Sequence, residues 1–281
     1  MKSKDLHNSI ATELQDLYQE NEAKNISSIL LEALYGIDRT ALIVDQEITQ
    51  TSKSENQLND ALARLKQHEP IQYVLEKAHF YGRDFIVNPS VLIPRRETEE
   101  LVHLILQDHP NFSGKILDIG TGSGCIPITL SLELPQAEVA SIDISTEAIK
   151  VANQNANALH AHVFFQVMNV LSASKLPARY DIIVSNPPYV MNREKKQMQE
   201  NVLDHEPHLA LFVEDDDPLI FYHAIIKKAA ESLNRAGMLY FEINEQFGSE
   251  VASKMESNSF QNVEIIKDMQ GKDRIIKGIY V

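Results

Sequence analysis

The chain has 281 residues, 43% of them hydrophobic and 23% charged, and its 26 basic and 40 acidic side chains leave a formal net charge of −14. This composition is ordinary for a globular protein of about two domains, and it excludes a disordered or collagen-like chain. The acidic balance argues against direct nucleic-acid binding, which needs clustered cations. A single cysteine, Cys125, excludes an intramolecular disulfide and a cysteine-rich zinc site. The chain has no signal-peptide-like segment and no apolar run of membrane-spanning length, so we expect a cytoplasmic protein that does not enter a membrane.

The first 70 residues predict a small bundle of helices. Apolar residues recur there at three- and four-residue steps, which is the spacing of one face of an amphipathic helix. These stripes cover residues 6–17, 26–34 and 58–65. Gly36 is placed to end the second helix, Asp38 to cap a short third helix, and Pro70 to stop the last one.

Between residues 73 and 93 the period changes. Phe80, Phe85, Val87 and Val91 are interleaved with turn-forming residues. This pattern predicts short strands joined by turns, a β-hairpin linker between two domains.

From residue 94 onward, expected strands and helices alternate. The expected strands are 115–119, 138–142, 162–167, 181–185, 237–243, 263–267 and 274–280, and the expected helices are 97–106, 125–132, 145–158, 219–233 and 250–256. Strands this apolar predict an α/β fold with a seven-stranded, mostly parallel sheet covered on both faces. The predicted domains are a helical domain (1–72), the hairpin (73–93) and an α/β domain (94–281). Ligands of such sheets bind at the carboxyl ends of the strands, so we expect the chemistry after the first, second and fourth strands.

A glycine-rich loop, Ile-Gly-Thr-Gly-Ser-Gly at 119–124, follows the first strand and opens a helix. Alternate glycines let the backbone turn tightly and approach a ligand, and the helix start offers free N–H donors. Asp143 ends the second strand, where a carboxylate can accept both ribose hydroxyls of an adenosine. S-adenosylmethionine is favoured over NAD because Asp118 would repel a pyrophosphate but suits a cofactor that carries a sulfonium and an ammonium. The predicted cofactor-binding residues here are Asp118, Gly120, Thr121, Gly122, Ser123, Gly124 and Asp143.

The fourth strand ends in the turn Asn186-Pro187-Pro188-Tyr189. Its two prolines fix φ, so the turn is rigid and presents its carbonyl groups. An amide or aromatic amino nitrogen is a poor nucleophile because its lone pair is delocalised. The side-chain oxygen of Asn186 and the carbonyl of Pro187 can hold its two hydrogens and direct the lone pair at a methyl group, while Tyr189 stacks on the planar amide. Positioning and preorganised dipoles would then drive the transfer without a metal.

On these motifs the chain resembles the class I S-adenosylmethionine-dependent methyltransferases, and more closely the peptide chain release factor glutamine methyltransferase family. Further segments that carry the resemblance are 69–75, 91–95, 97–99, 206–207, 210–211 and 273–274. The resemblance implies a Rossmann-like fold and methylation of the glutamine side-chain amide in the Gly-Gly-Gln motif of class 1 release factors. It also implies that Asn169 and Val170 flank the adenine, that Asn186 lies beside the cofactor as well as the substrate, and that the helical domain contacts the release factor. We expect a monomer.

Three positions depart from the family's pattern. Arg96 replaces a proline, Asn169 replaces an acidic residue that meets the adenine amino group, and the acidic run 214–217 followed by Pro218 replaces a glycine-containing turn. Two other readings remain open at this stage: a glutamine methyltransferase of a ribosomal protein, and a non-catalytic cofactor-binding adaptor. The run Asp-His-Glu-Pro-His at 204–208 is not expected to bind a metal, and Cys125 is expected to pack behind the glycine loop.

Overall fold

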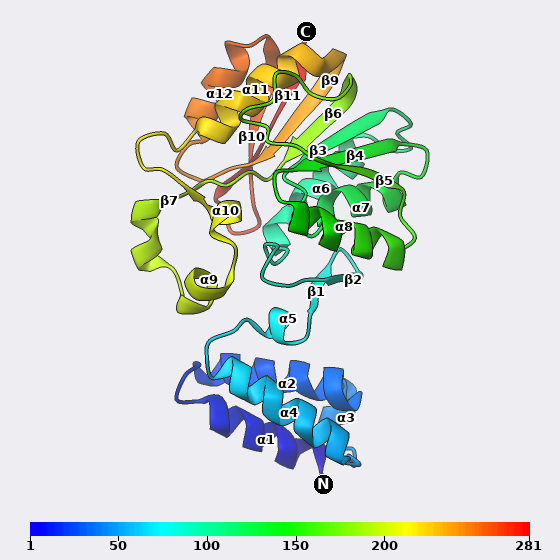
Figure 1. Ribbon diagram of the computed structural model, residues 1–281, viewed down its shortest axis with the longest axis vertical. Helices are drawn as coiled ribbons and strands as arrows, with labels where there is room; N and C mark the ends of the chain where they lie inside the picture. The colour runs from blue at the N-terminus through cyan, green and yellow to red at the C-terminus, as the bar shows by residue number, and fades with distance from the viewer. The chain divides into compact units, whose positions relative to one another are not determined.

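The computed structural model describes residues 1–281 and divides them into two compact units (Figure 1). One unit contains 1–76 and 199–205, and the other contains 77–198 and 206–281. No helix is long and apolar enough to cross a membrane.

The first unit is a bundle of helices around one apolar core. The helices of the bundle are α1 (Ser3–Leu14), α2 (Glu20–Tyr35), α3 (Arg39–Ile43), α4 (Ser52–Leu65) and α5 (Ile71–Val74). The unit also contains α9 (Glu200–His205), which contributes no residue to the apolar core. The predicted caps are confirmed: Gly36 ends α2 in the left-handed conformation at φ 66°, and Asp38 Oδ1 accepts the Ala41 N–H at 2.7 Å. The first predicted helix is too long, because α1 ends at Leu14 and Leu17 lies beyond it, 40% exposed.

The second unit is built on a seven-stranded sheet in the order β10-β11-β9-β6-β3-β4-β5. The strands are β3 (Lys115–Ile119), β4 (Glu138–Asp143), β5 (Val163–Val167), β6 (Tyr180–Ser185), β9 (Leu233–Glu242), β10 (Phe260–Lys267) and β11 (Asp273–Tyr280). The five strands from β5 to β9 pair in parallel, while β11 and β10 are antiparallel. The predicted fold class is therefore confirmed. The chain crosses from β5 back over β3 to β6, so the strand order reverses beside β3.

Helices cover both faces of this sheet (Figure 1). Side chains alternate along each strand, so Ile182 and Val184 of β6 pack on one face and Ile183 on the other. The first face is covered by α6 (Arg96–Asp108), α7 (Cys125–Glu133) and α8 (Thr146–Ala158), and the second by α11 (Ile220–Ser232) and α12 (Gly248–Glu256).

The predicted hairpin is confirmed only over β1 (Lys77–Phe80) and β2 (Arg83–Ile86). Phe80 and Phe85 are fully buried in the same cluster as α6. Val87 and Val91 are buried too, but in a loop rather than a strand, so their apolar character reflects burial and not strand pairing.

Between β6 and α11 lies a segment with little regular structure that the sequence did not predict. It contains β7 (Val190–Met191), η1 (Asn192–Gln197), α9, α10 (His208–Leu211) and β8 (Phe212–Val213). β7 and β8 pair in parallel as a separate short sheet.

Candidate active site

A cavity of about 240 Å³ lies at the carboxyl ends of β3, β4 and β6, where the sequence placed the chemistry. The predicted site residues that line it are Gly120, Thr121, Gly122, Ser123, Asp143, Asn169, Val170, Asn186, Pro187 and Pro188. Three predicted residues, Asp118, Gly124 and Tyr189, do not line it. Lining residues to which the sequence analysis assigned no role include Leu92, Arg95, Thr98, Leu209, Ala210 and Phe221.

The glycine loop lies close to the Asn-Pro-Pro-Tyr turn in this cavity. Gly120 has φ 91°, and a Cβ built there would lie 3.7 Å from the carbonyl oxygen of Asn186. Gly124 has φ 84°, and its Cβ would lie 2.8 Å from Ile128 Cδ1 and 3.1 Å from Ala152 Cβ. Gly124 therefore allows α7 to approach α8 closely, which explains a glycine that faces away from the cavity.

Asp143 holds the glycine loop and still faces the cavity. Its Oδ2 accepts the Gly122 N–H at 3.0 Å, and its Oδ1 accepts the Ser145 N–H at 2.8 Å. Burial raises the pKa of this carboxyl, and the backbone N–H groups oppose the rise. Each oxygen keeps a second lone pair, which is the requirement for accepting a pair of ribose hydroxyls.

Asp118 is fully buried beneath the glycine loop. Its Oδ2 accepts the Ser141 hydroxyl at 2.5 Å, and Ser141 in turn lies 2.5 Å from Thr121 Oγ1. Burial raises the pKa of Asp118 to about 7, with a further contribution from the charge of Asp143. Asp118 Oδ1 has no hydrogen-bond partner, and neither has the buried hydroxyl of Ser123. Buried polar atoms without partners are rare. Ser123 lines the cavity, so its hydroxyl fits a polar ligand at the glycine loop, whereas Asp118 lies beneath the loop and does not reach the cavity.

Asn155 is a supporting residue that sequence reasoning missed. It is 1% exposed, and its Oδ1 accepts the Ile86 N–H at 2.6 Å. Its Nδ2 donates to the carbonyl oxygens of Ile86 and Ser123, both at 2.9 Å. One amide therefore ties β2 and the glycine loop to α8. No local signal marks it, because an asparagine inside a helix is usually solvent-facing.

The opposite wall of the cavity is held by a buried carboxylate. Glu206 Oε1 accepts Arg95 Nη2 at 2.5 Å, and its Oε2 accepts the Ile93 N–H at 3.2 Å. The Glu206 side chain is 1% exposed. Both oxygens of Glu206 therefore bind the loop that follows the hairpin. This structural role explains why a glutamate stands in the run 204–208. Cys125 was expected to pack behind the glycine loop, but it is half-buried and lines the cavity. Burial raises the pKa of its thiol to about 12.

Behind the cavity, the Asn-Pro-Pro-Tyr turn is tied to one carboxylate. Asn186 Nδ2 donates to Thr98 Oγ1 at 3.2 Å, and the Thr98 hydroxyl donates to Glu242 Oε2 at 2.6 Å. The Tyr189 hydroxyl donates to Glu242 Oε1 at 3.0 Å. Burial raises the pKa of Glu242, while the bonds from Thr98 and Tyr189 oppose the rise. Burial and the charge of Glu242 also raise the pKa of Tyr189.

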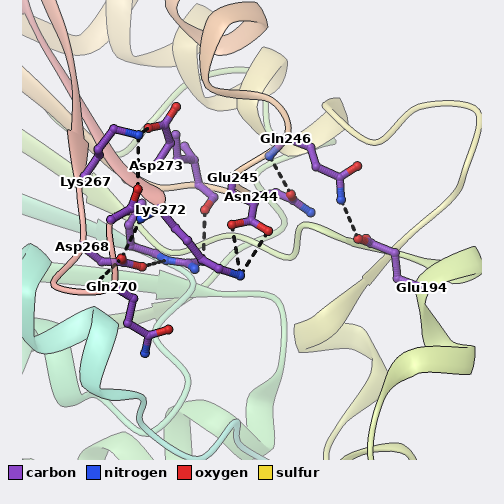
Figure 2. A network of polar contacts seen from close by, with 12 residues as sticks. Glu194, Asn244, Glu245, Gln246, Lys267, Asp268, Gln270, Lys272 and Asp273 are labelled. Carbon is purple, nitrogen blue, oxygen red and sulfur yellow. Dashed lines mark hydrogen bonds and ion pairs between the residues drawn. The ribbon is translucent and has the colours of Figure 1, made fainter.

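The loop after β9 anchors the chain that leaves this turn (Figure 2). Asn244 Nδ2 donates to the Tyr189 carbonyl at 3.2 Å, and its Oδ1 accepts the Gln246 N–H at 3.0 Å. Gln246 Nε2 donates to Glu194 Oε1 at 2.9 Å, and Figure 2 shows these two side chains pointing toward one another. Glu194 also accepts the Met191 N–H at 2.8 Å. The turn is therefore fixed from both sides.

The same figure shows the neighbouring turn between β10 and β11. Asp268, 7% exposed, accepts the N–H groups of Gln270 and Lys272, each at 2.9 Å, and pairs with Arg274 Nε at 3.1 Å. The pKa of Asp268 is lowered, mostly by the hydrogen bond from the backbone N–H of Lys272. Arg274 is thus held rigidly near Glu242, whose negative charge it favours.

The fold matches known methyltransferases. A methyltransferase from Pyrococcus furiosus aligns with a TM-score of 0.53 and 16% identity, covering 82% of this chain and 98% of its own. The 16S rRNA N2 G1207 methyltransferase of T. thermophilus, solved in complex with AdoMet and guanosine, aligns with a TM-score of 0.52 and 16% identity, covering 73% of this chain and 50% of its own. Residues 96–209 match the Methyltransferase small domain. The chain therefore has the Rossmann-like α/β fold of the class I methyltransferases, as the sequence predicted.

The particular family follows from longer matches. Residues 5–75 match the PrmC N-terminal domain. The release factor glutamine methyltransferase of Bacteroides thetaiotaomicron is 46% identical over 268 residues, covering 95% of this chain and 96% of the relative. That of Flavobacterium psychrophilum is 44% identical over 268 residues, covering 94% of each. The chain belongs to the release factor glutamine methyltransferase family.

Proposed function

We propose that this chain transfers a methyl group from S-adenosylmethionine to the side-chain amide nitrogen, N5, of the glutamine in the Gly-Gly-Gln motif of class 1 peptide chain release factors. One observation carries the proposal beyond family membership. The Asn186 amide lines the cavity next to the glycine loop, with its Nδ2 engaged by Thr98 and its Oδ1 free of protein donors. An acceptor in this place suits a substrate that brings N–H groups.

The cofactor would lie along the glycine loop. The N–H groups of Gly120, Thr121 and Gly122 are already donated to the Ile142 carbonyl and to Asp143, so the loop would shape the cavity and offer the unpartnered Ser123 hydroxyl. Asp143 would accept the ribose hydroxyls. Val170, 7% exposed, would pack against the adenine. Asn169 Oδ1 already accepts the Leu171 N–H at 2.9 Å, so its second lone pair would meet the adenine amino group. Bound S-adenosylmethionine supplies a methyl group on a sulfonium, whose sulfur keeps the bonding electron pair when the methyl group leaves.

The residues of the turn would act by position. Asn186 Oδ1 and the Pro187 carbonyl accept the two hydrogens of the glutamine amide, so the nitrogen lone pair turns out of conjugation and points along the transfer direction. The nitrogen then loses one proton to solvent. Pro187 and Pro188 hold these acceptors at fixed φ, so little reorganisation is needed at the moment of transfer. Tyr189 does not line the cavity, so instead of stacking on the amide it would support the turn through its bond to Glu242.

Each of the three segments of the chain would have its own role. The helical domain, 1–72, would contact the body of the release factor, the hairpin region 73–93 would link the domains, and residues 94–281 would carry out catalysis. We expect the enzyme to act as a monomer in the cytoplasm, where release factors work, without contacting nucleic acid.

Intact-mass analysis tests this proposal. A purified class 1 release factor is incubated with the enzyme and S-adenosylmethionine, and the matched control is the same factor with its Gly-Gly-Gln glutamine changed. We expect a single added methyl group on the unaltered factor and none on the control. Absence of the methyl group on a folded release factor would overturn the assigned substrate, and a ribosomal protein would be the next to assay.

A further inference from the structure

Two side chains behind the cavity form a hydrogen-bonded chain that ends at the reacting turn. We propose that Thr98 and Glu242 are positioning residues that set the orientation of the Asn186 amide, so that its Oδ1 and not its Nδ2 faces the substrate. The inference rests on the proposed function and deepens it, because it names the residues that turn the oxygen of the Asn186 amide toward the substrate.

The direction of the hydrogen bonds carries the argument. Glu242 is a carboxylate that receives donors at both oxygens. The single hydroxyl proton of Thr98 is committed to Glu242, so Thr98 Oγ1 can only accept from its other neighbour. That neighbour is Asn186, which must therefore present Nδ2 to Thr98, as observed at 3.2 Å. A flipped amide would place Oδ1 against the lone pairs of Thr98 with no proton between them.

Burial gives this preference its strength. Thr98 is 3% exposed in the first turn of α6, and Glu242 is 1% exposed at the end of β9. With so little exposed surface, these groups have few ways to replace a lost partner with water, so a mismatched pair is costly. Burial raises the pKa of Glu242, and the hydrogen bonds from Thr98 and Tyr189 together with the positive charge of Arg274 oppose the rise by favouring the ionised form, which has no proton to give to Thr98.

Glu242 also reaches the far end of the turn. Its Oε1 accepts the Tyr189 hydroxyl, so one carboxylate holds both Asn186, through Thr98, and Tyr189 directly. Glu242 does not line the cavity, so it acts only through these neighbours. Thr98 does line it, but its proton points to Glu242 and not into the open space.

Kinetics of three variants test the inference. Thr98→Val keeps the shape and removes the hydrogen bonds, Thr98→Ser keeps the hydroxyl, and Thr129→Val is the matched control, since Thr129 is fully buried in α7 and its hydroxyl has no partner. We expect Thr98→Val to lower kcat about 10- to 100-fold with the cofactor Kd within about threefold. We expect Thr98→Ser and Thr129→Val to stay within about threefold of the wild type in both constants. The inference is wrong where Thr98→Val behaves like Thr129→Val, or where Thr98→Ser is as slow as Thr98→Val.

Glu242→Gln provides a second route that does not depend on the folding of Thr98→Val. Glutamine keeps the size of the side chain, but its amide must donate to either Thr98 or Tyr189, and Thr98 can then turn its proton toward Asn186. We expect a loss of kcat of about the same size, with little change in cofactor affinity. If the side-chain NH2 signals of Asn186 move in Glu242→Gln while kcat is unaltered, the orientation of this amide does not control transfer and the inference is wrong.

A measurement without substrate separates this inference from the proposed function. The side-chain NH2 signals of Asn186 are identified by NMR as those missing in Asn186→Asp. Loss of the Thr98 acceptor should move them in Thr98→Val and leave them unmoved in Thr129→Val. Unmoved signals in Thr98→Val would refute the inference even if the wild type methylates release factors, and moved signals would support it even if the substrate proves to be another protein.

Discussion

At the scale of single residues, the proposed function makes the free Oδ1 of Asn186 the group on which transfer depends. We predict that Asn186→Ala lowers kcat at least about 100-fold, because one preorganised acceptor is lost. The cofactor Kd should change less than about threefold, since the glycine loop and Asp143 are intact. Release factor methylation and calorimetric titration with S-adenosylmethionine measure the two effects.

The exposed Asn153 on α8 gives the control for this substitution, because Asn153→Ala removes the same amide at a position that does not line the cavity. It should leave both constants near the wild-type values. Loss of all cofactor binding in Asn186→Ala would contradict the assigned role.

The carboxylate of Asp143 belongs to the cofactor side of the same cavity. We predict that Asp143→Ala raises the Kd for S-adenosylmethionine about 10- to 100-fold, because the ribose hydroxyls and the Gly122 N–H both lose an acceptor. Titration calorimetry measures the Kd, and a thermal melt of the variant verifies that it folds. A Kd equal to that of the wild type would remove Asp143 from the binding site.

Asp118 makes the cofactor-free protein sensitive to pH. Its pKa of about 7 in the folded state lies well above the ordinary value, so the folded protein holds this proton more tightly than the unfolded chain. The contribution of Asp118 to the free energy of unfolding therefore falls as pH rises from about 4 to about 7, and is constant above that. Chemical denaturation of the wild type and Asp118→Asn across this range measures the difference. A difference between the two proteins that does not decrease with pH would contradict the prediction.

At the scale of elements, Gly124 at the N-terminus of α7 has a positive φ and lies close to its neighbours, so any side chain there would be both strained and crowded. Gly124→Ala places a Cβ at positive φ and also against Ile128 and Ala152. Gly271, in the turn before β11, has φ 83° and nothing within 4 Å of its Cβ position, so Gly271→Ala suffers the strain alone. We predict losses in the free energy of unfolding of about 1 kcal/mol for Gly271→Ala and about 2–4 kcal/mol for Gly124→Ala. Urea denaturation compares them, and equal losses would show that α7 and α8 can separate freely.

At the scale of the whole molecule, the pair Arg95–Glu206 joins segments 111 residues apart in the chain. Removing the arginine leaves the nearly buried carboxylate of Glu206 without its counter-charge, whereas removing both charges does not. Because Arg95 is 36% exposed, we discount the usual cost of a broken buried pair. We predict a coupling of about 1–3 kcal/mol in a double-mutant cycle of Arg95→Ala and Glu206→Gln, followed by denaturation. Additive effects would mean that solvent already screens the pair.

Much of this protein could be predicted from its sequence because the signals are local. Periodicity placed the bundle and the seven strands, and it failed where burial lay outside regular structure, as at Val87 and Val91. Glycines and prolines mark the backbone turns themselves, so the glycine loop and the Asn-Pro-Pro-Tyr turn stood out without any tertiary information.

Only the tertiary structure decided which distant polar groups support those turns. Asn155, Glu206 and Glu242 carry no local signature, because the role of a buried polar side chain depends on the donors or acceptors that the fold brings to it. The strand ending in Glu242 showed only a carboxylate after an apolar run; its partners Thr98 and Tyr189 come from other elements. By itself the sequence determined where the chain turns and which groups could meet the cofactor and the substrate amide. The packing of α6 and β9 against the turn decided which way the Asn186 amide faces, because that orientation follows from hydrogen bonds between segments far apart in the chain.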